Sequence, residues 1–504
     1  MPVRTGQGKR LRSSIRWGHG GGEGCAGLDA FYRFSMHPAG DSREATLSAA
    51  KRGDASLAES AEPDRYQDRA ERLRVFRAID RELESLERGP PSRVAAIQLE
   101  GLRRMVLHAR AQTAFYRDRL APVFAGSRFD PSRWSEIPIL TRFELRRHAE
   151  AIHATTTPDA EYGIIGSETS GSSGTPVRFR WNGMAAVATR GAMERLFAWH
   201  RLDPNATLVE LRTFMRDSAE PRVQERRPWS FRGRGQRHEI NAALPLRQQL
   251  ALLRSLRPRY LLTYPTLARD LAMTATSDGH DPLSLDAILT VGEVMTDDIR
   301  RLCARVFGAV VIDAYGCQEM GKIALECPVS GLYHVCAASV CLEVLDDGGR
   351  PVQPGEIGRA IVTSLYNYAT PFIRYELGDH VRLASAPCPC GRALPAIAEI
   401  MGRRRNMITL PDGDRRWLSG KVLAGFADFV PLRQYRLVQS QRNRLELLYV
   451  PDGSGREPDI AGLENFVRQS IHPVMTIAVT PRVEIPRSRG GKYEDVVGLD
   501  SSEA

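Results

Sequence analysis

The feature that most constrains the fold of this chain is a series of short apolar runs, each bounded by turn residues and separated from the next by a helical segment. Four of these runs are "YLLTY" (260–264), "AILTVGE" (287–293), "AVVIDAYG" (309–316) and "RAIVTSL" (359–365). Runs of this length and composition are typical of strands that are buried on both faces. The chain is therefore predicted to be an α/β protein built around a buried sheet.

Two amphipathic helices are predicted ahead of these strands. Apolar residues recur at helical spacing from Leu73 to Leu86, where "ERGPPS" ends the pattern, and again from Leu99 to Leu120. A different pattern, "SVCLEVLDDGGRPV", contains an Asp-Gly turn between two apolar runs. It predicts a hairpin beside the main sheet.

At 504 residues the chain is too long for one ordinary core, and its composition changes twice. Residues 1–65 are basic or polar and are expected to be a disordered extension, with Met36 as an alternative start. Residues 66–402 are expected to form a large N-terminal α/β domain. A charged, turn-rich segment begins at Arg403, and alternating runs such as "YRLVQS" then indicate a small α+β C-terminal domain, 403–504.

Composition excludes several classes of function. No apolar run approaches the length of a membrane span, so no membrane partner is expected. The net charge of +10 comes from arginines spread along the whole sequence, while lysine occurs only at positions 9, 51, 322, 421 and 492. This pattern, without any nucleic-acid-binding motif, predicts no nucleic-acid partner. The cysteines are too few for a disulfide framework, which favours a reducing, cytoplasmic setting.

The segment "TSGSSGTP" (169–176) consists almost entirely of glycine and hydroxylated residues. Small residues allow backbone N–H groups to close around a phosphate, and hydroxyls add further donors. A flexible linker has a similar composition and is the alternative interpretation. The segment lacks the Gly-Lys-Ser/Thr ending of a Walker motif, so ordinary transfer of a γ-phosphoryl group is not expected.

Three motifs downstream carry further candidate residues. "DAYGCQE" places Tyr315 at a strand end, Gly316 in the turn and Glu319 just beyond, which suits an aromatic ring against a base and a carboxylate for Mg²⁺. "PFIRYELGD" ends in Asp379, which is suited to ribose hydroxyls, and "RGGKYEDVV" carries Lys492 behind two glycines. A core tyrosine, a surface carboxylate, a common Gly-Asp turn and a solvated lysine are the alternatives.

The order of these motifs resembles that of the adenylate-forming enzymes, and most closely the phenylacetate-coenzyme A ligase-like branch with its capsule-biosynthesis relatives. The resemblance runs from about Leu102 to Lys492 and includes a Gly-Glu pair, Gly292 and Glu293. The motifs that carry it are "HARAQTAFYRDRL", "IPILTRFELR", "TSGSSGTPV", "YGCQEMGKIALEC", "PFIRYELGD", "CPCGRALP" and "GRRRNMI".

The resemblance implies that the carboxylate of a small organic acid, aryl or related, attacks the α-phosphorus of ATP in the presence of Mg²⁺. Acyl-adenylate and pyrophosphate would result, and the C-terminal domain would then rotate for the second half-reaction. Lys492 and Glu319 take the catalytic roles. The implied nucleotide contacts are Thr169, Ser170, Gly171, Ser172, Ser173, Gly174, Thr175, Gly292, Glu293, Tyr315, Gly316, Asp379 and Arg403.

The acceptor is less well defined than the nucleotide site. A thiol such as coenzyme A is expected, but "RRRNMITLPDGDRRW" stands where coenzyme A ligases of this family usually have an acidic pair and a glycine-rich segment. Gln318 also stands where threonine is common. An amine, a hydroxyl or a carrier-protein thiol is therefore an alternative acceptor. The reaction is expected to serve secondary metabolism or surface-polymer assembly. A homodimer is a further open alternative.

A nucleotide-binding scaffold without activity is the alternative of a different class. Glu319, Asp379 and Lys492 are all present, which argues against it. The acid is expected to bind near Phe214, Tyr264 and Gly292, whose identities set neither its size nor its polarity.

A separate constellation consists of Cys327, His334, Cys388 and Cys390, from "ECPVSGLYH" and "CPCG". Three thiols and an imidazole suit a closed tetrahedral zinc site that pins the predicted hairpin to the main domain. Reduced thiols without a metal are the alternative, because the spacing is not that of a standard zinc finger.

Overall fold

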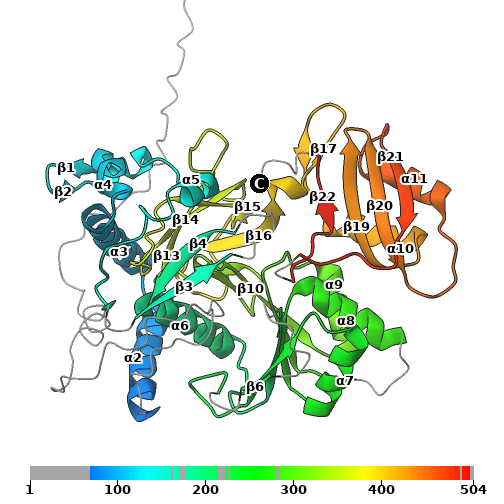
Figure 1. Cartoon of the computed structure of the whole chain (residues 1–504), viewed down its shortest axis with the longest axis horizontal. Coiled ribbons are helices and arrows are strands. Elements are labelled where there is room, and N and C mark those ends of the chain that lie inside the picture. Colours follow the sequence, from blue (N-terminus) through cyan, green and yellow to red (C-terminus); the bar gives the residue numbers. More distant parts are fainter. Residues whose placement is uncertain are drawn as a thin grey trace, which may run out of the picture.

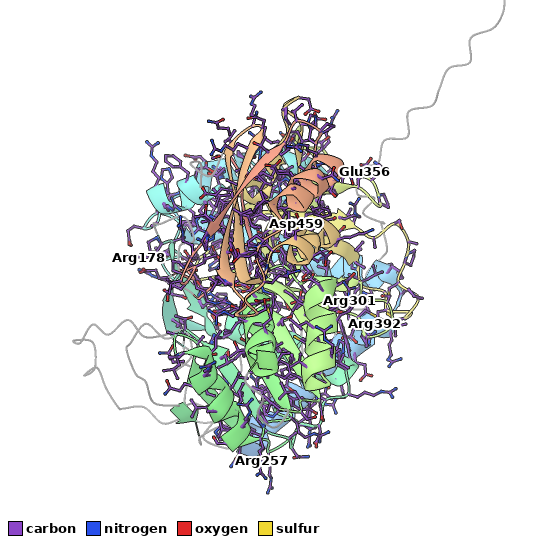
Figure 2. All side chains as sticks on the ribbon, turned by 90° about the vertical axis from the view of Figure 1, so that its right-hand side faces the viewer. Arg178, Arg257, Arg301, Glu356, Arg392 and Asp459 are labelled. Carbon is purple, nitrogen blue, oxygen red and sulfur yellow. The ribbon has the colours of Figure 1, made fainter. Side chains whose placement is uncertain are left out.

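The computed structural model describes residues 69–160, 163–169, 176–213, 222–224, 228–277, 283–488 and 491–499. The predicted extension, 1–65, lies outside the described residues, as do Phe214 and the loop residues Ser170 to Thr175. No described helix is long and apolar enough to cross a membrane. The arginines labelled in Figure 2 (Arg178, Arg257, Arg301 and Arg392) come from separate segments of the chain.

A twelve-stranded mixed sheet forms the centre of the large domain (Figure 1). Its order is β13-β14-β15-β16-β12-β11-β10-β9-β8-β5-β7-β6. Five neighbouring strands run parallel: β7 (Arg237–Asn241), β5 (Leu208–Arg212), β8 (Tyr260–Thr263), β9 (Ala287–Val291) and β10 (Val310–Cys317). Three of the four apolar runs identified in the sequence are these parallel strands.

Helices cover both faces of the parallel strands. The helices α7 (Leu246–Leu256), α8 (Pro265–Ser277) and α9 (Asp297–Phe307) pack on one face, and α6 (Gly183–Trp199) packs on the other. Side chains alternate between the two faces: Val209 and Leu211 contact the first group, and Leu208 contacts α6. Strands β8 and β9, at the centre of this group, are largely apolar because both of their faces are buried. The α/β prediction is confirmed.

The other half of the sheet is antiparallel. It consists of β11 (Gly321–Glu326), β12 (Tyr333–Val335), β16 (Ala396–Arg403), β15 (Tyr375–Leu383), β14 (Ile357–Ser364) and β13 (Val340–Leu345), with β6 (Arg222–Gln224) at the opposite edge. The fourth apolar run, 359–365, therefore lies in this half.

The prediction of a separate hairpin beside the main sheet is wrong. β13 pairs along its whole length with β14 and forms the edge of the main sheet itself. After the turn, the chain returns with a single bridge between Leu345 and Pro351. The predicted turn is present, because the Gly349 N–H donates to the Asp346 carbonyl at 3.0 Å. β14, however, pairs with β13 continuously from Val340 to Leu345, whereas the return segment forms a single bridge.

Two long helices precede the sheet, as predicted, but the second ends at Gln112 and does not continue to Leu120 as its spacing indicated. They are α2 (Arg69–Arg88) and α3 (Pro91–Gln112), and α3 begins with proline in its first turn. The chain then passes through α4 (Tyr116–Arg119), the turn helices Ala121–Val123 and Pro131–Glu136, and the short pair β1 (Phe124–Ala125) and β2 (Arg128–Phe129). It reaches α5 (Arg142–Arg147), which a capping box of Thr141 and Glu144 begins.

The hairpin of β3 (Ile164–Glu168) and β4 (Arg178–Asn182) leads from this region into α6. Because its two strands pair from Ile164 with Asn182 to Glu168 with Arg178, the ends of the glycine- and serine-rich segment between them are held together.

The C-terminal part has its own sheet and core. After the turn Arg404–Asn406 come the pair β17 (Ile408–Thr409) and β18 (Arg415–Arg416), then α10 (Gly420–Phe429) and α11 (Ile460–Ser470). The sheet has the order β21 (Thr476–Pro481), β20 (Arg444–Pro451), β19 (Leu432–Gln441) and β22 (Val496–Val497). This small α+β unit lies beside the carboxyl edge of the parallel strands (Figure 1).

Candidate active site

The ends of the predicted phosphate loop are held by the β3–β4 hairpin. Thr169 donates its N–H to the Val177 carbonyl at 2.9 Å, and the Val177 N–H donates to Thr169 Oγ1 at 3.0 Å. The loop residues between them, Ser170 to Thr175, lie outside the described part of the chain. Thr169 itself is buried, and its hydroxyl points toward α5 rather than solvent.

Arg142, the first residue of α5, connects the loop to the carboxylate predicted for Mg²⁺. Its Nη2 donates to Thr169 Oγ1 at 2.8 Å, and its Nη1 lies 3.4 Å from Glu319 Oε1. The sequence-based predictions did not include Arg142. The only available signal was its position directly after the capping threonine in "ILTRFELR", which places the side chain at a helix start.

Glu319 is buried and has a second neighbour on the sheet. Tyr375 of β15 donates its hydroxyl to Glu319 Oε1 at 3.3 Å, and burial raises the pKa of Tyr375 well above its usual value. Glu319 thus lies between a cation and a phenol. Carboxylate oxygens are the ligands that Mg²⁺ prefers, so this residue fits the cation that accompanies a nucleotide.

The pair predicted for the nucleoside is also brought together. The Tyr315 hydroxyl donates to Asp379 Oδ2 at 3.0 Å, and Arg403 Nε donates to Asp379 Oδ1 at 3.3 Å. Asp379 and Arg403 face each other directly in the β15–β16 pairing. Burial, followed by the charge of Asp379, raises the pKa of Tyr315, so its ring is neutral at any physiological pH.

Gly316 lies within β10 and not in the predicted turn, and it allows β11 to approach closely at this point. A Cβ at this position would lie 2.2 Å from the carbonyl oxygen of Gly321, so only glycine fits. The β10–β11 pairing shifts register between Tyr315 and Gly316. A bulge in the pairing therefore lies directly beside Tyr315.

Lys492 reaches the carboxyl end of β9 from the other unit. A Cβ at Gly292, which has a φ of +82°, would lie 3.2 Å from Lys492 Cε and 3.4 Å from its Nζ, and 3.6 Å from the ring of Tyr264. Gly491, beside the lysine, is equally constrained, since a Cβ there would lie 2.0 Å from Thr213 Oγ1. The glycines around Lys492 therefore let the tail pack closely on the ends of the strands.

Glu293 holds this tail in place. Its Oε1 accepts the N–H of Tyr493 at 2.6 Å, and its Oε2 accepts the N–H and the hydroxyl of Thr266 at 2.9 Å and 2.7 Å. Burial raises the pKa of Glu293, and Arg487 at 3.6 Å opposes that rise. In this conformation the carboxylate predicted to contact nucleotide docks the C-terminal tail.

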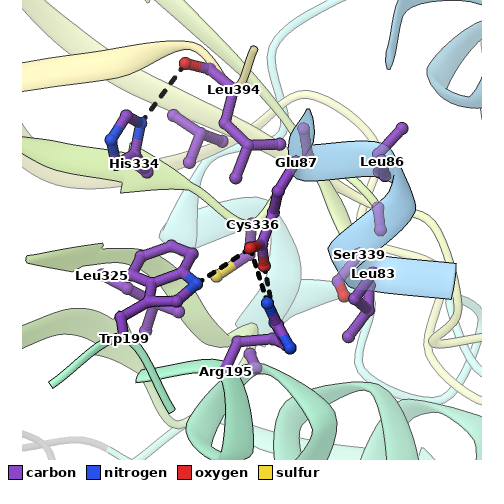
Figure 3. Close-up of a pocket in the computed structure, with 14 residues that line it drawn as sticks. Leu83, Leu86, Glu87, Arg195, Trp199, Leu325, His334, Cys336, Ser339 and Leu394 are labelled. Carbon is purple, nitrogen blue, oxygen red and sulfur yellow. Dashed lines mark hydrogen bonds and ion pairs between the residues drawn. The ribbon is translucent and has the colours of Figure 1, made fainter. Parts of the chain in front are cut away.

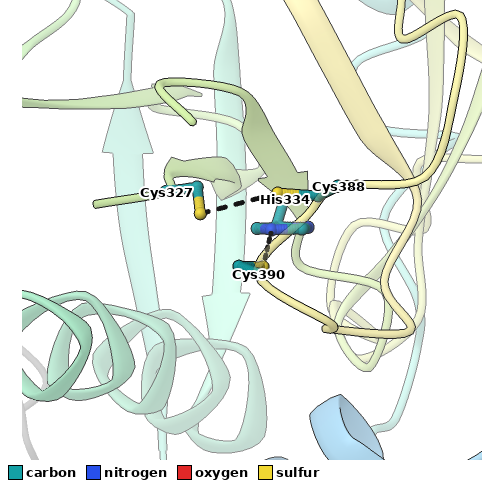
Figure 4. Close-up of side chains that lie close together, drawn as sticks. All are labelled: Cys327, His334, Cys388 and Cys390. Carbon is teal, nitrogen blue, oxygen red and sulfur yellow. Dashed lines mark hydrogen bonds between the residues drawn. The ribbon is translucent and has the colours of Figure 1, made fainter. Parts of the chain in front are cut away.

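The four predicted metal ligands converge in space (Figure 4). The ligand atoms of Cys327, His334, Cys388 and Cys390 all lie within 4.8 Å of one another. Cys388 Sγ is 3.7 Å from Cys327 Sγ, and His334 Nε2 is 3.2 Å from Cys390 Sγ. Burial lowers the pKa of His334 to about 4, so a ring nitrogen is free of a proton at neutral pH.

Arg392 links this cluster to the N-terminal helix. It packs over the Trp199 ring at 4.3 Å and lies 3.7 Å from Glu87 Oε2 of α2. Glu87 also accepts two hydrogen bonds from Arg195 of α6, at 2.7 Å and 2.8 Å (Figure 3). The cavity in Figure 3, ≈ 30 Å³ in volume, lies among these side chains and contains none of the predicted nucleotide contacts.

Comparisons with known proteins define the class to which this arrangement belongs. The structure of 2-hydroxyisobutyryl-CoA ligase in the postadenylation state, in complex with R3-HIB-AMP, superposes with a TM-score of 0.65 at 20% identity, over 83% of this chain and 91% of that one. The same ligase in the thioesterification state, with 2-HIB-AMP and CoA, gives a TM-score of 0.56 at 21% identity, over 82% and 91% of the two chains. The chain thus has the fold of the adenylate-forming ligases.

Sequence similarity points to one branch of that class. A phenylacetate-coenzyme A ligase of Thermus thermophilus is 26% identical over 281 residues, which are 50% of this chain and 63% of that protein. One of Pseudomonas putida is 29% identical over 174 residues, 32% of this chain and 38% of that protein. No family model matches the chain. The resemblance expected from the motifs is confirmed. The matched residues span less than two thirds of the length of each of these two relatives.

Proposed function

We propose that this chain is an ATP-dependent, AMP-forming ligase, which activates a small carboxylic acid as its acyl-adenylate and transfers the acyl group to a thiol such as coenzyme A. The observation that carries the proposal is the approach of Lys492 to Gly292 and Tyr264, at the carboxyl edge of the parallel strands. Ligands of open α/β sheets bind at this edge. The phenylacetate-coenzyme A ligases and the 2-hydroxyisobutyryl-CoA ligase found by comparison support the same reaction type.

In the first half-reaction, the acid carboxylate attacks the α-phosphorus of ATP and pyrophosphate leaves. Negative charge is then shared between the carboxylate and the α-phosphate, and the ammonium group of Lys492 is positioned to stabilise it. Arg142, held at Thr169 and Glu319, is positioned to meet the departing pyrophosphate. Tyr315 and Asp379 are positioned for the base and the ribose.

Mg²⁺ bound at Glu319 would neutralise phosphate charge during this step. The fit rests on the buried carboxylate of Glu319, which offers a hard oxygen ligand beside the anchor of the phosphate loop. Arg142 already provides a positive charge at the same carboxylate, at 3.4 Å.

The C-terminal unit is proposed to occupy its adenylation position here and to rotate afterwards. The higher TM-score against the postadenylation state than against the thioesterification state supports this assignment. In the rotated position Lys492 would be withdrawn, and the acceptor would approach the acyl-adenylate instead.

The decisive experiment measures the two half-reactions of Lys492→Ala separately. Acid-dependent exchange of pyrophosphate into ATP should fall by about 10²–10³-fold, the usual cost of removing one preorganised charge donor. Transfer from synthetic acyl-adenylate to coenzyme A should continue near the wild-type rate. A panel of aryl and aliphatic acids identifies the substrate, and replacing coenzyme A by amines or carrier protein identifies the acceptor. Equal loss in both half-reactions would contradict domain alternation.

We also propose that Cys327, His334, Cys388 and Cys390 bind one structural zinc ion. Three thiolates and an imidazole are a common ligand set for closed tetrahedral zinc, and their mutual distances of up to 4.8 Å suit it. The ligands come from the loop between β11 and β12, from β12 itself and from the loop before β16, so the ion would tie three neighbouring segments together.

A further inference from the structure

A lysine in the interior of the large domain has no role in the reaction described above. Lys322 is the second residue of β11 and is largely enclosed by protein. Within the described part of the chain, its ammonium group has no hydrogen bond or ion pair. Burial lowers the pKa of Lys322 to about 8. A desolvated cation without a partner costs free energy, so its retention calls for an explanation.

The backbone of Lys322 is held by strand pairing and by close packing on α6. Its Cα pairs with Gly316 across the bulge between β10 and β11. Gly321, just before it, has a φ of +70°, and a Cβ there would lie 2.1 Å from Thr189 Oγ1 of α6 and 3.0 Å from the Trp181 ring. Strand β11 therefore starts in close contact with α6, directly before Lys322.

The side chain of Lys322 lies on the α6 face of the sheet. Ala314 and Leu325, which pair with each other, both pack against α6, and Gly316 follows Ala314 by two residues. Because strand residues alternate between faces, Gly316 and its partner Lys322 share the α6 face. Glu210 of β5, two residues after Leu208, lies on this face too, and its charge acts on Lys322.

Lys322 also lies close to the reaction centre. Ala314 of β10 pairs with Val291 of β9, and Gly292 follows Val291 at the carboxyl edge. Lys322 is one strand beyond β10, so its Cα is about two strand spacings, roughly 10 Å, from Gly292, where Lys492 approaches. A small acid with its carboxylate at Lys492 can therefore extend toward the Lys322 ammonium group.

The surface between these points is apolar. Leu262 of β8 and Val291 of β9 are partly exposed and face α6, and Gly316 adds no side chain. β5 and β11 are four strands apart, about 19 Å at about 4.8 Å per strand, so charged groups flank a stretch of small and aliphatic residues. Such a surface suits the carbon skeleton of an acid.

The carboxylates near Lys322 have other partners. Glu210 Oε1 is 2.8 Å from Arg212 Nε, and Glu210 Oε2 pairs with Arg237. Asp313 accepts hydrogen bonds from Thr290 Oγ1 at 2.7 Å and from the Tyr333 hydroxyl at 3.0 Å. Burial raises the pKa of Asp313, which weakens it as a counter-ion. The carboxylates of Glu210 and Glu239 are thus already paired with Arg212 and Arg237.

We infer that Lys322 is a specificity-determining residue, which binds a second anionic or hydrogen-bond-accepting group on the acid, distant from the carboxylate that is adenylated. The inference rests on the proposed function and narrows its substrate class to polar-ended acids such as dicarboxylates. The apolar strip between Gly292 and Lys322 binds the carbon chain or ring of the acid, and Lys322 binds its far end.

The test compares acids of matched size in acid-dependent pyrophosphate exchange: adipate against hexanoate, and terephthalate against 4-methylbenzoate. A hydrogen bond to a charged group contributes about 1.5–3 kcal/mol, so kcat/KM for the dicarboxylate should exceed that for its partner by about 10–100-fold. Lys322→Met should abolish this preference and leave kcat/KM for the apolar acid unchanged or higher. Lys322→Arg should keep part of the preference.

Lys421→Met, at an exposed position of α10, is the matched control and should retain the wild-type preference. Thermal melting of each variant separates loss of folding from loss of recognition, and Lys322→Gln replaces Lys322→Met if the latter does not fold. The inference is overturned if the wild type prefers the apolar acids, or if Lys322→Met lowers kcat/KM equally for both acids of a matched pair. In either case exchange still occurs and the proposed function stands. Absence of exchange with every acid would overturn both.

Discussion

At the scale of single residues, the site depends on side chains that hold one another in place before any ligand binds. Arg142 is the clearest case, because it contacts both Thr169 and Glu319 while keeping about a quarter of its side chain exposed. A guanidinium group with this placement is available to phosphate oxygens without rearrangement, and Arg binds phosphate through several donors in a fixed geometry.

We therefore expect Arg142→Met to lower kcat/KM for ATP in pyrophosphate exchange by about 10²–10³-fold. The Mg²⁺ concentration needed for half-maximal activity should fall at the same time, because Glu319 loses a competing cation. Initial rates over a matrix of ATP and Mg²⁺ concentrations measure both effects. Arg142→Lys should restore part of the rate.

Arg147→Met is the control, since Arg147 is exposed on the same helix. It should leave both parameters unchanged. If Arg142→Met changed the melting temperature but neither the ATP nor the Mg²⁺ dependence, Arg142 would be a structural link between α5 and the sheet and nothing more.

At the scale of elements, the antiparallel half of the sheet is held together where it adjoins α2 and α6. The cluster of Cys327, His334, Cys388 and Cys390 joins β12 to the loop before β16. Arg392, in the same loop, reaches Glu87 of α2. A metal ion at the cluster would thus order the loop on which α2 packs.

The expected result is about one zinc ion per purified chain, the stoichiometry of a single tetrahedral site. Cys388→Ser should remove most of the metal and lower the melting temperature, and a strong chelator should lower the melting temperature of the wild type but not of the variant. Elemental analysis and thermal melting measure these two quantities.

Cys303→Ala provides the comparison, because Cys303 is buried in α9 outside the cluster. It should lower stability by creating a small cavity while retaining zinc. Purified wild-type protein without zinc, or Cys388→Ser with unchanged stability, would favour the alternative of reduced thiols without a metal.

At the scale of the whole molecule, the two units are joined by buried ion pairs as well as by Lys492. Arg487 of the tail pairs with Asp270 of α8 at 2.5 Å, and Arg269 of α8 pairs with Asp495 at 3.0 Å. Both residues of α8 are buried. These pairs stabilise the position in which Lys492 reaches Gly292, and they must break if the C-terminal unit rotates.

Asp270→Asn should therefore slow adenylation by about 10–100-fold, because the docked position of the C-terminal unit loses the ion pair between Asp270 and Arg487. It should leave transfer from synthetic acyl-adenylate unchanged or faster, because the unit leaves its first position more easily. Rapid-mixing measurements of each half-reaction distinguish these effects. Asp428→Asn, at an exposed position of α10, should affect neither. A uniform loss in both half-reactions would mean that Asp270 serves stability alone.

Local sequence patterns predicted much of the molecule correctly. The apolar runs at 260–264, 287–293 and 309–316 became parallel strands, because strands buried on both faces leave a continuous apolar signature. The two N-terminal helices followed from their spacing. The order of the motifs led to the adenylate-forming ligases, which the fold confirmed.

What only the tertiary structure decided involves contacts between distant segments. β13 pairs with β14 and not with the chain after its own turn. Arg142 meets Glu319 across 177 residues, and Glu293 binds the tail at Tyr493 across 200. The isolation of Lys322 depends on Glu210 already being paired with arginines. A sequence determines local periodicity and turn chemistry directly, but the partners of a buried charge are set by packing, since they depend on which strands and helices come to lie side by side.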